Sequence, residues 1–120
     1  MLRNRQKIAV RLTPTRTDNQ VLLSFYHRAS ASNLIIVYKL EAYMSTGGSN
    51  ANNANKLLKA DGSTDFGISV TTANTTGHKV SSNTAPVSIT DSGFRVIQTG
   101  GVSDTTGIGI LIIDLEIIWT

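Results

Sequence analysis

Short runs in which apolar and polar residues alternate recur along the chain, and this period of two restricts the fold more than any other feature. The clearest run is Gln6–Leu12, where Ile8 and Val10 alternate with Lys7 and Arg11. A β-strand directs successive side chains to opposite faces, so such runs predict half-buried strands. Further strands are expected over residues 21–28, 34–44, 66–71, 79–82, 86–90, 94–98 and 108–119.

The composition supports the same fold class. The chain has 15 Thr, 12 Ser, 9 Asn and 10 Gly among its 120 residues, against 11 basic and 8 acidic side chains. These short uncharged residues favour turns and loops, and the residues that favour helices are scarce. We therefore predict an all-β chain, a single antiparallel β-sandwich or jelly-roll domain of about seven or eight strands spanning residues 1–120.

Two connections carry signals of how the strands are joined. Residues 29–33 form a short polar segment, so the strands over 21–28 and 34–44 are expected to pair as a hairpin. The turn signal Asp91-Ser92-Gly93 is expected to join the two strands on either side of it.

Two other segments are less regular. Residues 45–55 are rich in Ser, Gly and Asn, so we expect an exposed loop that is either mobile or held by a partner. Lys56–Ala60 fits either a helical turn or a short strand.

Two of the expected strands are apolar on both faces. Over residues 34–38 and 108–118, large aliphatic side chains occupy outward as well as inward positions. Because a sheet in a two-layer sandwich has one dry and one wet face, a second apolar face indicates an interface, and a symmetric homo-oligomer such as a trimer would bury it. The alternative is that loops such as 45–60 cover this face. The predicted oligomer interface consists of Ile35, Val37, Ile108, Ile110, Ile112 and Ile118.

Two carboxylates, Asp114 and Glu116, share that face. They could act as a catalytic pair, but no helper residue stands near them in the sequence. We interpret them as charges that protect an aggregation-prone strand from pairing with other chains.

Positive charge is concentrated at the start of the chain. The net charge of +3 combines a balance of +5 over residues 1–28 with one of −2 over residues 29–120. We expect residues 1–6 to form a basic arm and predict a partner-docking set on and beside it. The set consists of Arg3, Arg5, Lys7 and Arg11. No aromatic residues are interleaved for base stacking, so an acidic protein neighbour is a better expectation than nucleic acid, although Lys7 and Arg11 also fit a solvated strand face.

Other candidate sites have ordinary explanations. Asp61–Asp65 places oxygen ligands at alternate positions but lacks the later bidentate Glu of a calcium loop, so a turn capped by Asp explains it. Neither His27 nor His78 has a metal-binding neighbour at ligand spacing, and His27 is interpreted as structural. Cysteine is absent, and no nucleophile or phosphate-binding motif occurs. We expect no enzyme activity, no cofactor and no metal.

The remaining expectations concern aromatic residues and membranes. Tyr26, Tyr38, Tyr43 and Trp119 could form a platform that stacks on sugars, but core packing is the preferred interpretation. The apolar runs are too short to cross a bilayer, and no signal peptide is recognisable, so no membrane association is expected.

The chain as a whole resembles small viral structural proteins. The resemblance is carried by cysteine-free strands, polar loops such as 45–55 and 99–107, the basic arm, and the closing aliphatic strand in Gly107–Trp119. The most similar class is the jelly-roll cement or decoration proteins of phage capsids, which are typically trimers that clamp capsid subunits. The resemblance implies a virion protein, assembled in the host cytoplasm, that binds and stabilises a capsid lattice.

Two further functions remain open at this point. One is a receptor- or glycan-binding module of a phage fibre or spike, which predicts exposed aromatic residues. The other is a shell protein that coats RNA or DNA, which predicts salt-sensitive binding through the basic arm.

Overall fold

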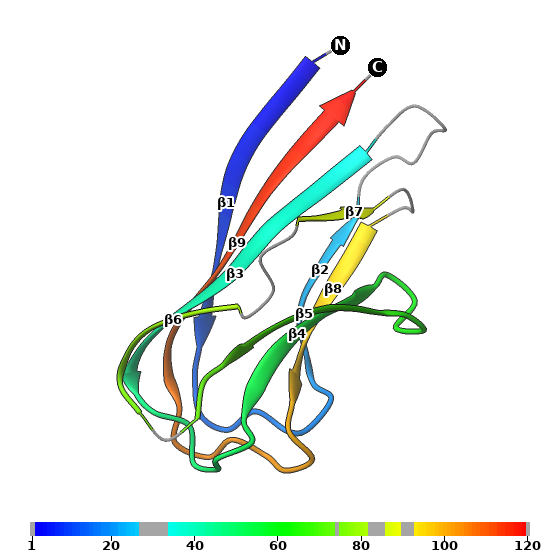
Figure 1. Cartoon of the computed structure of the whole chain (residues 1–120). Coiled ribbons are helices and arrows are strands. Elements are labelled where there is room, and N and C mark those ends of the chain that lie inside the picture. The colour runs from blue at the N-terminus through cyan, green and yellow to red at the C-terminus, as the bar shows by residue number, and fades with distance from the viewer. Residues whose placement is uncertain (1, 27–33, 74, 82–85, 90–92, 120) are drawn as a thin grey trace.

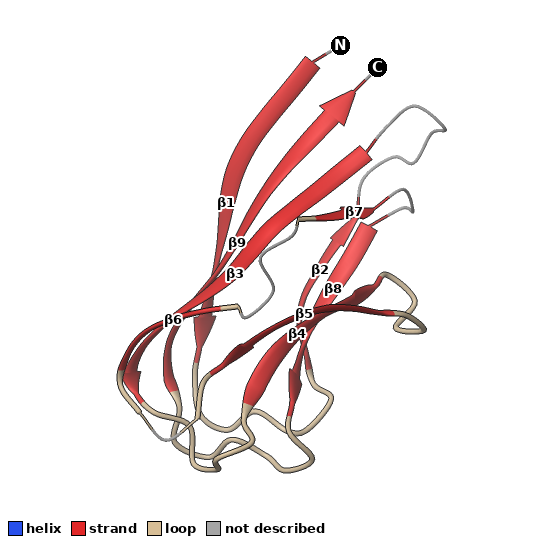
Figure 2. Cartoon of the chain, viewed as in Figure 1, coloured by secondary structure: helices blue, strands red, loops and turns tan. Residues whose placement is uncertain are grey.

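A computed structural model of the chain describes residues 2–26, 34–73, 75–81, 86–89 and 93–119. All regular elements in this part of the chain are strands, as Figure 2 shows. The nine strands are β1 (Leu2–Leu12), β2 (Val21–Tyr26), β3 (Leu34–Thr46), β4 (Ala54–Lys59), β5 (Asp65–Thr71), β6 (Gly77–Val80), β7 (Val87–Ile89), β8 (Gly93–Thr99) and β9 (Ile108–Trp119). The segment left undecided between helix and strand, Lys56–Ala60, thus falls largely in β4.

The strands form two antiparallel sheets, which confirms the predicted β-sandwich (Figure 1). The first sheet has the order β1-β9-β3-β6, with the short β7 also paired with β3. The second sheet has the order β2-β8-β4-β5. The molecule is elongated, 43 × 25 × 21 Å, and both chain ends lie at one pole because Leu2 is paired with Trp119.

The pairing follows a two-stranded ribbon wound into two sheets. The first strand pairs with the last, β1 with β9; then β2 pairs with β8, β3 with β6 and β7, and β4 with β5. This winding is that of a jelly roll. The pairs β9·β3 and β8·β4 then join successive turns of the ribbon side by side.

The expected hairpin of β2 with β3 is wrong. The two strands lie in different sheets, because β2 pairs with β8 while β3 pairs with β9 in the first sheet. Strands β7 and β8 also belong to different sheets, so their connection crosses from one layer to the other. Residues 91 and 92 of that turn lie outside the described residues.

The core lies between the sheets and is aliphatic. Its largest fully buried side chains include Leu12, Leu40, Leu111 and Ile113 from the first sheet and Phe94 from the second. A β-bulge between Val21 and Leu23 breaks the strict alternation of faces along β2. Val21 is exposed, while Leu22, Leu23 and Phe25 pack against the core.

A bulge in β3 has a larger consequence. The register against β9 shifts between Val37 and Lys39. Such a bulge adds a residue to one strand and changes which side chains face each side. Before it, Ile35 and Val37 point into the core; after it, Leu40 and Ala42 do. The faces expected from strict alternation along residues 34–44 are therefore wrong in their first half.

The expected basic arm is also part of the sheet. Residues 2–6 belong to β1 and are paired with β9 without a break in register up to Leu12. The arm expected over residues 1–6 is therefore wrong for residues 2–6, and residue 1 lies outside the described part.

The Ser-, Gly- and Asn-rich segment after β3 is held by the chain itself. The Gly48 amide donates to the Thr72 carbonyl at 2.6 Å, and the Asn50 amide donates to Asn53 Oδ1 at 2.8 Å. Gly48 and Asn53 are buried. The expectation of a loop that is either mobile or held by a partner is therefore wrong, because hydrogen bonds within the chain replace the missing apolar contacts.

Candidate docking surface

Alternate residues of four strands form the outer face of the first sheet, which is turned away from the second sheet. Toward the start of β9, Ile110 is paired with Tyr43 of β3, and these side chains are 47% and 45% exposed. Val80 on β6 and Ile108 on β9 are exposed to a similar degree, and Ile112 is paired with Ala9 of β1. The members of this apolar patch are Ala9, Tyr43, Val80, Ile108, Ile110 and Ile112.

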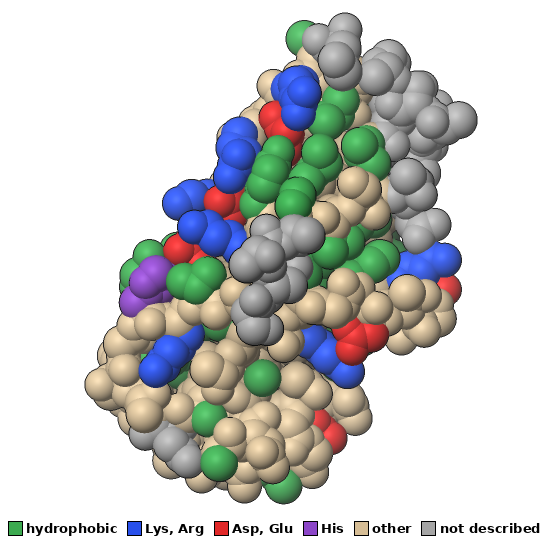
Figure 3. Space-filling view, viewed as in Figure 1, with side chains coloured by type: hydrophobic (Ala, Val, Ile, Leu, Met, Phe, Trp, Pro, Cys, Tyr) green, Lys and Arg blue, Asp and Glu red, His purple; other side chains and the backbone are tan. Residues whose placement is uncertain are grey.

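The other half of the same face carries a charged ladder. Its members are Arg3, Arg5, Lys7, Lys39, Asp114 and Glu116. Arg3 donates to Glu116 through Nη2 at 2.7 Å and Nε at 3.1 Å, and Arg5 donates to Asp114 through Nε at 2.8 Å and Nη2 at 3.0 Å. Both pairs are bidentate, the geometry that fixes guanidinium and carboxylate most firmly. Blue and red side chains run down one side of the molecule in Figure 3.

Tyr38 contacts both ion pairs. Its hydroxyl donates to Glu116 Oε1 at 2.8 Å, and the Arg5 guanidinium lies 3.7 Å from the centre of its ring. The hydrogen bond from Arg3, with a second from Tyr38, lowers the pKa of Glu116. The hydrogen bond from Arg5 likewise lowers the pKa of Asp114, although burial opposes it. Both carboxylates are therefore held in the charged form.

A histidine borders the apolar patch. The His78 ring stacks on Tyr43 with 4.3 Å between ring centres, and its Nε2 lies 3.2 Å from Glu41 Oε1. Lys39 Nζ lies 3.4 Å from the same Glu41 oxygen. These contacts fix the Tyr43 ring in place on the exposed sheet face.

The structure divides the six predicted interface residues into two groups. Ile108 and Ile110 are exposed and Ile112 is half-buried, so these three lie in the apolar patch. Ile35 and Val37 are fully buried in the core, because the β3 bulge reverses their side, and their assignment to an interface is wrong.

Ile118 is also wrongly assigned. It is 7% exposed and lies between Arg3 of β1 and Leu34 of β3 in the sheet register, so the chain covers it without a partner.

The predicted docking cations also divide. Arg3 and Arg5 are bound by Glu116 and Asp114, although about half of each arginine side chain stays exposed. Lys7 and Arg11 are exposed and make no ion pair or hydrogen bond to any described residue. Lys7 and Arg11 are therefore the two cations of the set available to a partner.

The role predicted for the two β9 carboxylates is wrong. β9 lies between β1 and β3 and is a central strand, so it has no free edge to protect. Asp114 and Glu116 are buried beside the arginines of β1 and bind them.

The aromatic residues do not form one platform. Tyr26 lies on β2 in the second sheet and Trp119 ends β9, while Tyr38 and Tyr43 lie in different halves of β3. Tyr26, Tyr43 and Trp119 are exposed, so the preferred interpretation that they pack in the core is wrong for these three.

The acidic turn is capped as expected. Asp61 Oδ1 accepts from the Ser63 amide at 2.8 Å, and Asp65 Oδ1 accepts from the Gly67 amide at 2.8 Å. No cluster of metal-binding side chains occurs among the described residues. His27 lies outside the described residues.

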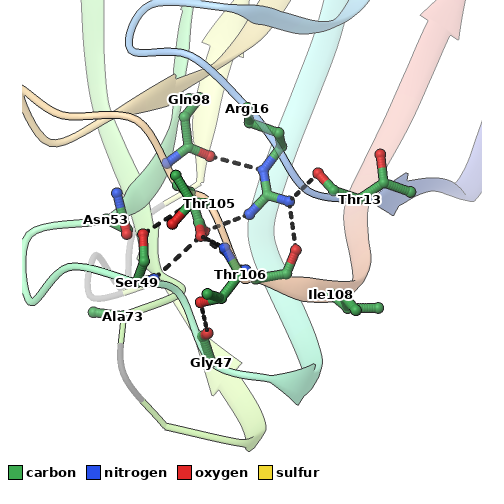
Figure 4. Close-up of polar contacts among 12 residues, drawn as sticks. Thr13, Arg16, Gly47, Ser49, Asn53, Ala73, Gln98, Thr105, Thr106 and Ile108 are labelled. Atoms are coloured by element: carbon green, nitrogen blue, oxygen red, sulfur yellow. Dashed lines mark hydrogen bonds and ion pairs between the residues drawn. The ribbon is translucent and has the colours of Figure 1, made fainter.

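One buried polar cluster has no counterpart in the sequence analysis (Figure 4). Arg16, 2% exposed, donates through Nη2 to Asp104 Oδ2 at 2.6 Å and through Nε to Gln98 Oε1 at 3.0 Å. Its Nη1 donates to the carbonyls of Thr13 and Gly107, each at 2.8 Å. Four contacts thus surround one guanidinium.

Asp104 completes this cluster, which we call the Arg16 clamp. Its Oδ1 accepts from the amides of Ser49, Thr106 and Gly107 at 3.2, 3.2 and 2.8 Å. The clamp ties together the loops before β2, after β3 and before β9. Because Asp104 is fully buried, no substrate reaches it, and the cluster is structural. Its two charged residues are 88 positions apart, so no local pattern in the sequence indicates the cluster.

The described part of the chain opens no pocket, and it contains no helix long and apolar enough to cross a membrane. The outer face of the first sheet therefore carries the candidate site. In comparisons with known proteins, no family model, no curated protein and no solved structure matches the chain.

Proposed function

We propose that the protein is a structural component of a virion, a decoration or cement protein that associates with itself and stabilises a capsid lattice. It acts by binding and catalyses no reaction. The observation that carries the proposal is the apolar patch, in which four large hydrophobic side chains on one sheet face are each more than two-fifths exposed. A contiguous surface of this kind is typical of an interface.

The size of the patch supports a role in an assembly. Full burial of an aliphatic or aromatic side chain contributes about 1.5–3 kcal/mol, so burying the exposed halves of four contributes about 3–6 kcal/mol. Association costs about 4–15 kcal/mol in lost freedom of motion. An isolated pair of copies is therefore weak. On a lattice each copy makes several contacts at once, and avidity turns weak contacts into stable attachment.

Two exposed cations support the proposed binding to a capsid lattice. Lys7 and Arg11 lie on the same sheet face as the patch and are free to meet acidic groups of a capsid protein. We expect a symmetric homo-oligomer, with a trimer as the expected form, in which the exposed side chains of β3, β6 and β9 in the patch are buried while β1 stays open to the lattice.

Self-association tests the apolar patch directly. Sedimentation velocity over a range of protein concentrations should show an oligomer that Ile110→Glu abolishes. Val21→Glu is the matched control, because Val21 is exposed to the same degree but lies on the second sheet. A protein that stays monomeric at the highest concentrations, alone and on shells, contradicts the proposal.

The cement role has its own measurement. Adding the protein to shells of its virus that lack it should raise the temperature at which they break. If shells with and without it break at the same temperature, that role is excluded.

A further inference from the structure

β1 is a long strand with one unpaired edge. It ends the first sheet, and along Leu2–Leu12 its ladder to β9 is continuous, without a bulge. No backbone hydrogen bond outside that ladder joins β1 to another described segment. Alternate backbone groups of a strand point to opposite sides, so a row of N–H and C=O groups along β1 is open to a further strand.

The side chains beside this edge select the strand that can pair with it. On the outer face, β1 presents Arg3, Arg5, Lys7 and Arg11 at alternate positions, interrupted by Ala9. A strand added next to β1 would place its own alternate side chains directly beside these cations. Opposite charges favour such a pair and like charges oppose it.

The sheet already contains one strand that satisfies this rule. On the paired side of β1, β9 offers Asp114 and Glu116 two positions apart, and they bind Arg5 and Arg3 in bidentate fashion. Lys7 lies opposite Asp114 and helps to lower its pKa, but neither Lys7 nor Arg11 makes an ion pair or hydrogen bond to a described carboxylate. The unpaired edge therefore lacks the acidic neighbour that the paired edge has.

A second copy of the chain does not supply that neighbour. Two β1 edges would bring cations against cations. The other edge strands, β2, β5, β6 and β7, together carry one carboxylate, that of Asp65, which lies 3.5 Å from Lys56 Nζ. The acidic strand must come from a different protein.

We propose that β1 is a β-augmentation site for an extended acidic segment of another protein. Alternate Asp or Glu side chains of that segment would lie beside Lys7, Arg11 and the exposed sides of Arg3 and Arg5, and its backbone would continue the first sheet. The inference rests on the proposed function for its biological setting, because it names the chemistry of the lattice segment that the protein binds. The opposing interpretation is that the cations repel every incoming strand.

A labelled peptide of five Glu-Thr repeats tests the site on the intact protein. Fluorescence anisotropy should show binding that weakens with salt, and hydrogen exchange should show new protection of β1 amides. The same peptide with N-methyl groups on alternate residues, and a peptide of five Lys-Thr repeats, should not bind.

The variant Lys7→Gln/Arg11→Gln should weaken binding about 2- to 30-fold, the effect of two lost cross-strand charge pairs. Lys56→Gln/Lys79→Gln makes the same change of net charge away from β1 and should bind like the unmodified protein. Arg3 and Arg5 are left unchanged because their removal would leave two buried carboxylates without their cations.

Absence of binding by the Glu-Thr peptide overturns the inference, and so does equal binding by the N-methylated peptide or equal weakening in both variants. Because self-association is measured without any peptide, a failure of the peptide to bind would not contradict the self-association proposed for the apolar patch. Loss of self-association with intact peptide binding would contradict the proposed oligomer and not the β1 site.

Discussion

Arg16→Met should destabilise the fold far more than its single charge suggests. The substitution leaves Asp104 fully buried without its cation and removes the donors that serve Gln98 and two backbone carbonyls. Removing one partner of a buried ion pair costs about 3–5 kcal/mol. Since a domain of this kind has about 5–15 kcal/mol of stability in total, the loss is a large fraction of it.

Urea denaturation monitored by tryptophan fluorescence measures this loss, with the m-value as the check that unfolding stays two-state. Arg16→Lys keeps the charge but cannot reach four acceptors, so it should lose about 1–3 kcal/mol and stay measurable if the Met variant fails to fold. Arg11→Met is the control, because this exposed arginine should change stability by no more than about 0.5 kcal/mol. A loss below about 1 kcal/mol in Arg16→Met, at an unchanged m-value, refutes the role given to the clamp.

Three further substitutions probe the core, the clamp and the charged ladder. Asn55→Leu should stabilise it by about 1–3 kcal/mol in urea denaturation, because the fully buried Asn55 amide has no hydrogen-bond partner among the described residues; a loss of stability would contradict this. Gly107→Ala should lower the melting temperature by several degrees in calorimetry, since a Cβ there would overlap the Asp104 carboxylate, and an unchanged melting temperature would show that the clamp yields. The pKa of Glu116 is lowered below its ordinary value of 4.5, so the stability it contributes is present above that pH and is lost as the pH falls through the folded pKa. Arg3→Gln should therefore reduce the loss of stability between neutral pH and about pH 3, and equal losses in both proteins would argue against the ion pair.

Most of the strands were predictable because the segment that forms each one alternates or is a short apolar run. Residues 66–71 and 94–98 alternate or are apolar, and each forms a strand close to the expected bounds. Pairing was less predictable. A short polar connection normally indicates a hairpin, yet in a ribbon wound into two sheets consecutive strands such as β2 and β3 separate into different layers.

Part of the candidate site could not be predicted from the sequence, for two physical reasons. Residues 34–38 are apolar at every position, so nothing in the sequence shows that a bulge after Val37 turns Ile35 into the core. The partners of Arg3 and Arg5 are over 100 residues away, and no local pattern connects them. The apolar patch was partly predicted, because Ile110 and Ile112 alternate with the buried Leu111 and Ile113 in a regular strand.

The place of β9 between β1 and β3 sets the order in which the protein can fold during its synthesis. Leu2 cannot meet its partner, Trp119, before β9 has been synthesised, and until then β1 and β3 have no strand between them. We expect the nascent chain to stay open until β9 is available and then to fold slowly, on the millisecond-to-second scale of chains dominated by distant contacts.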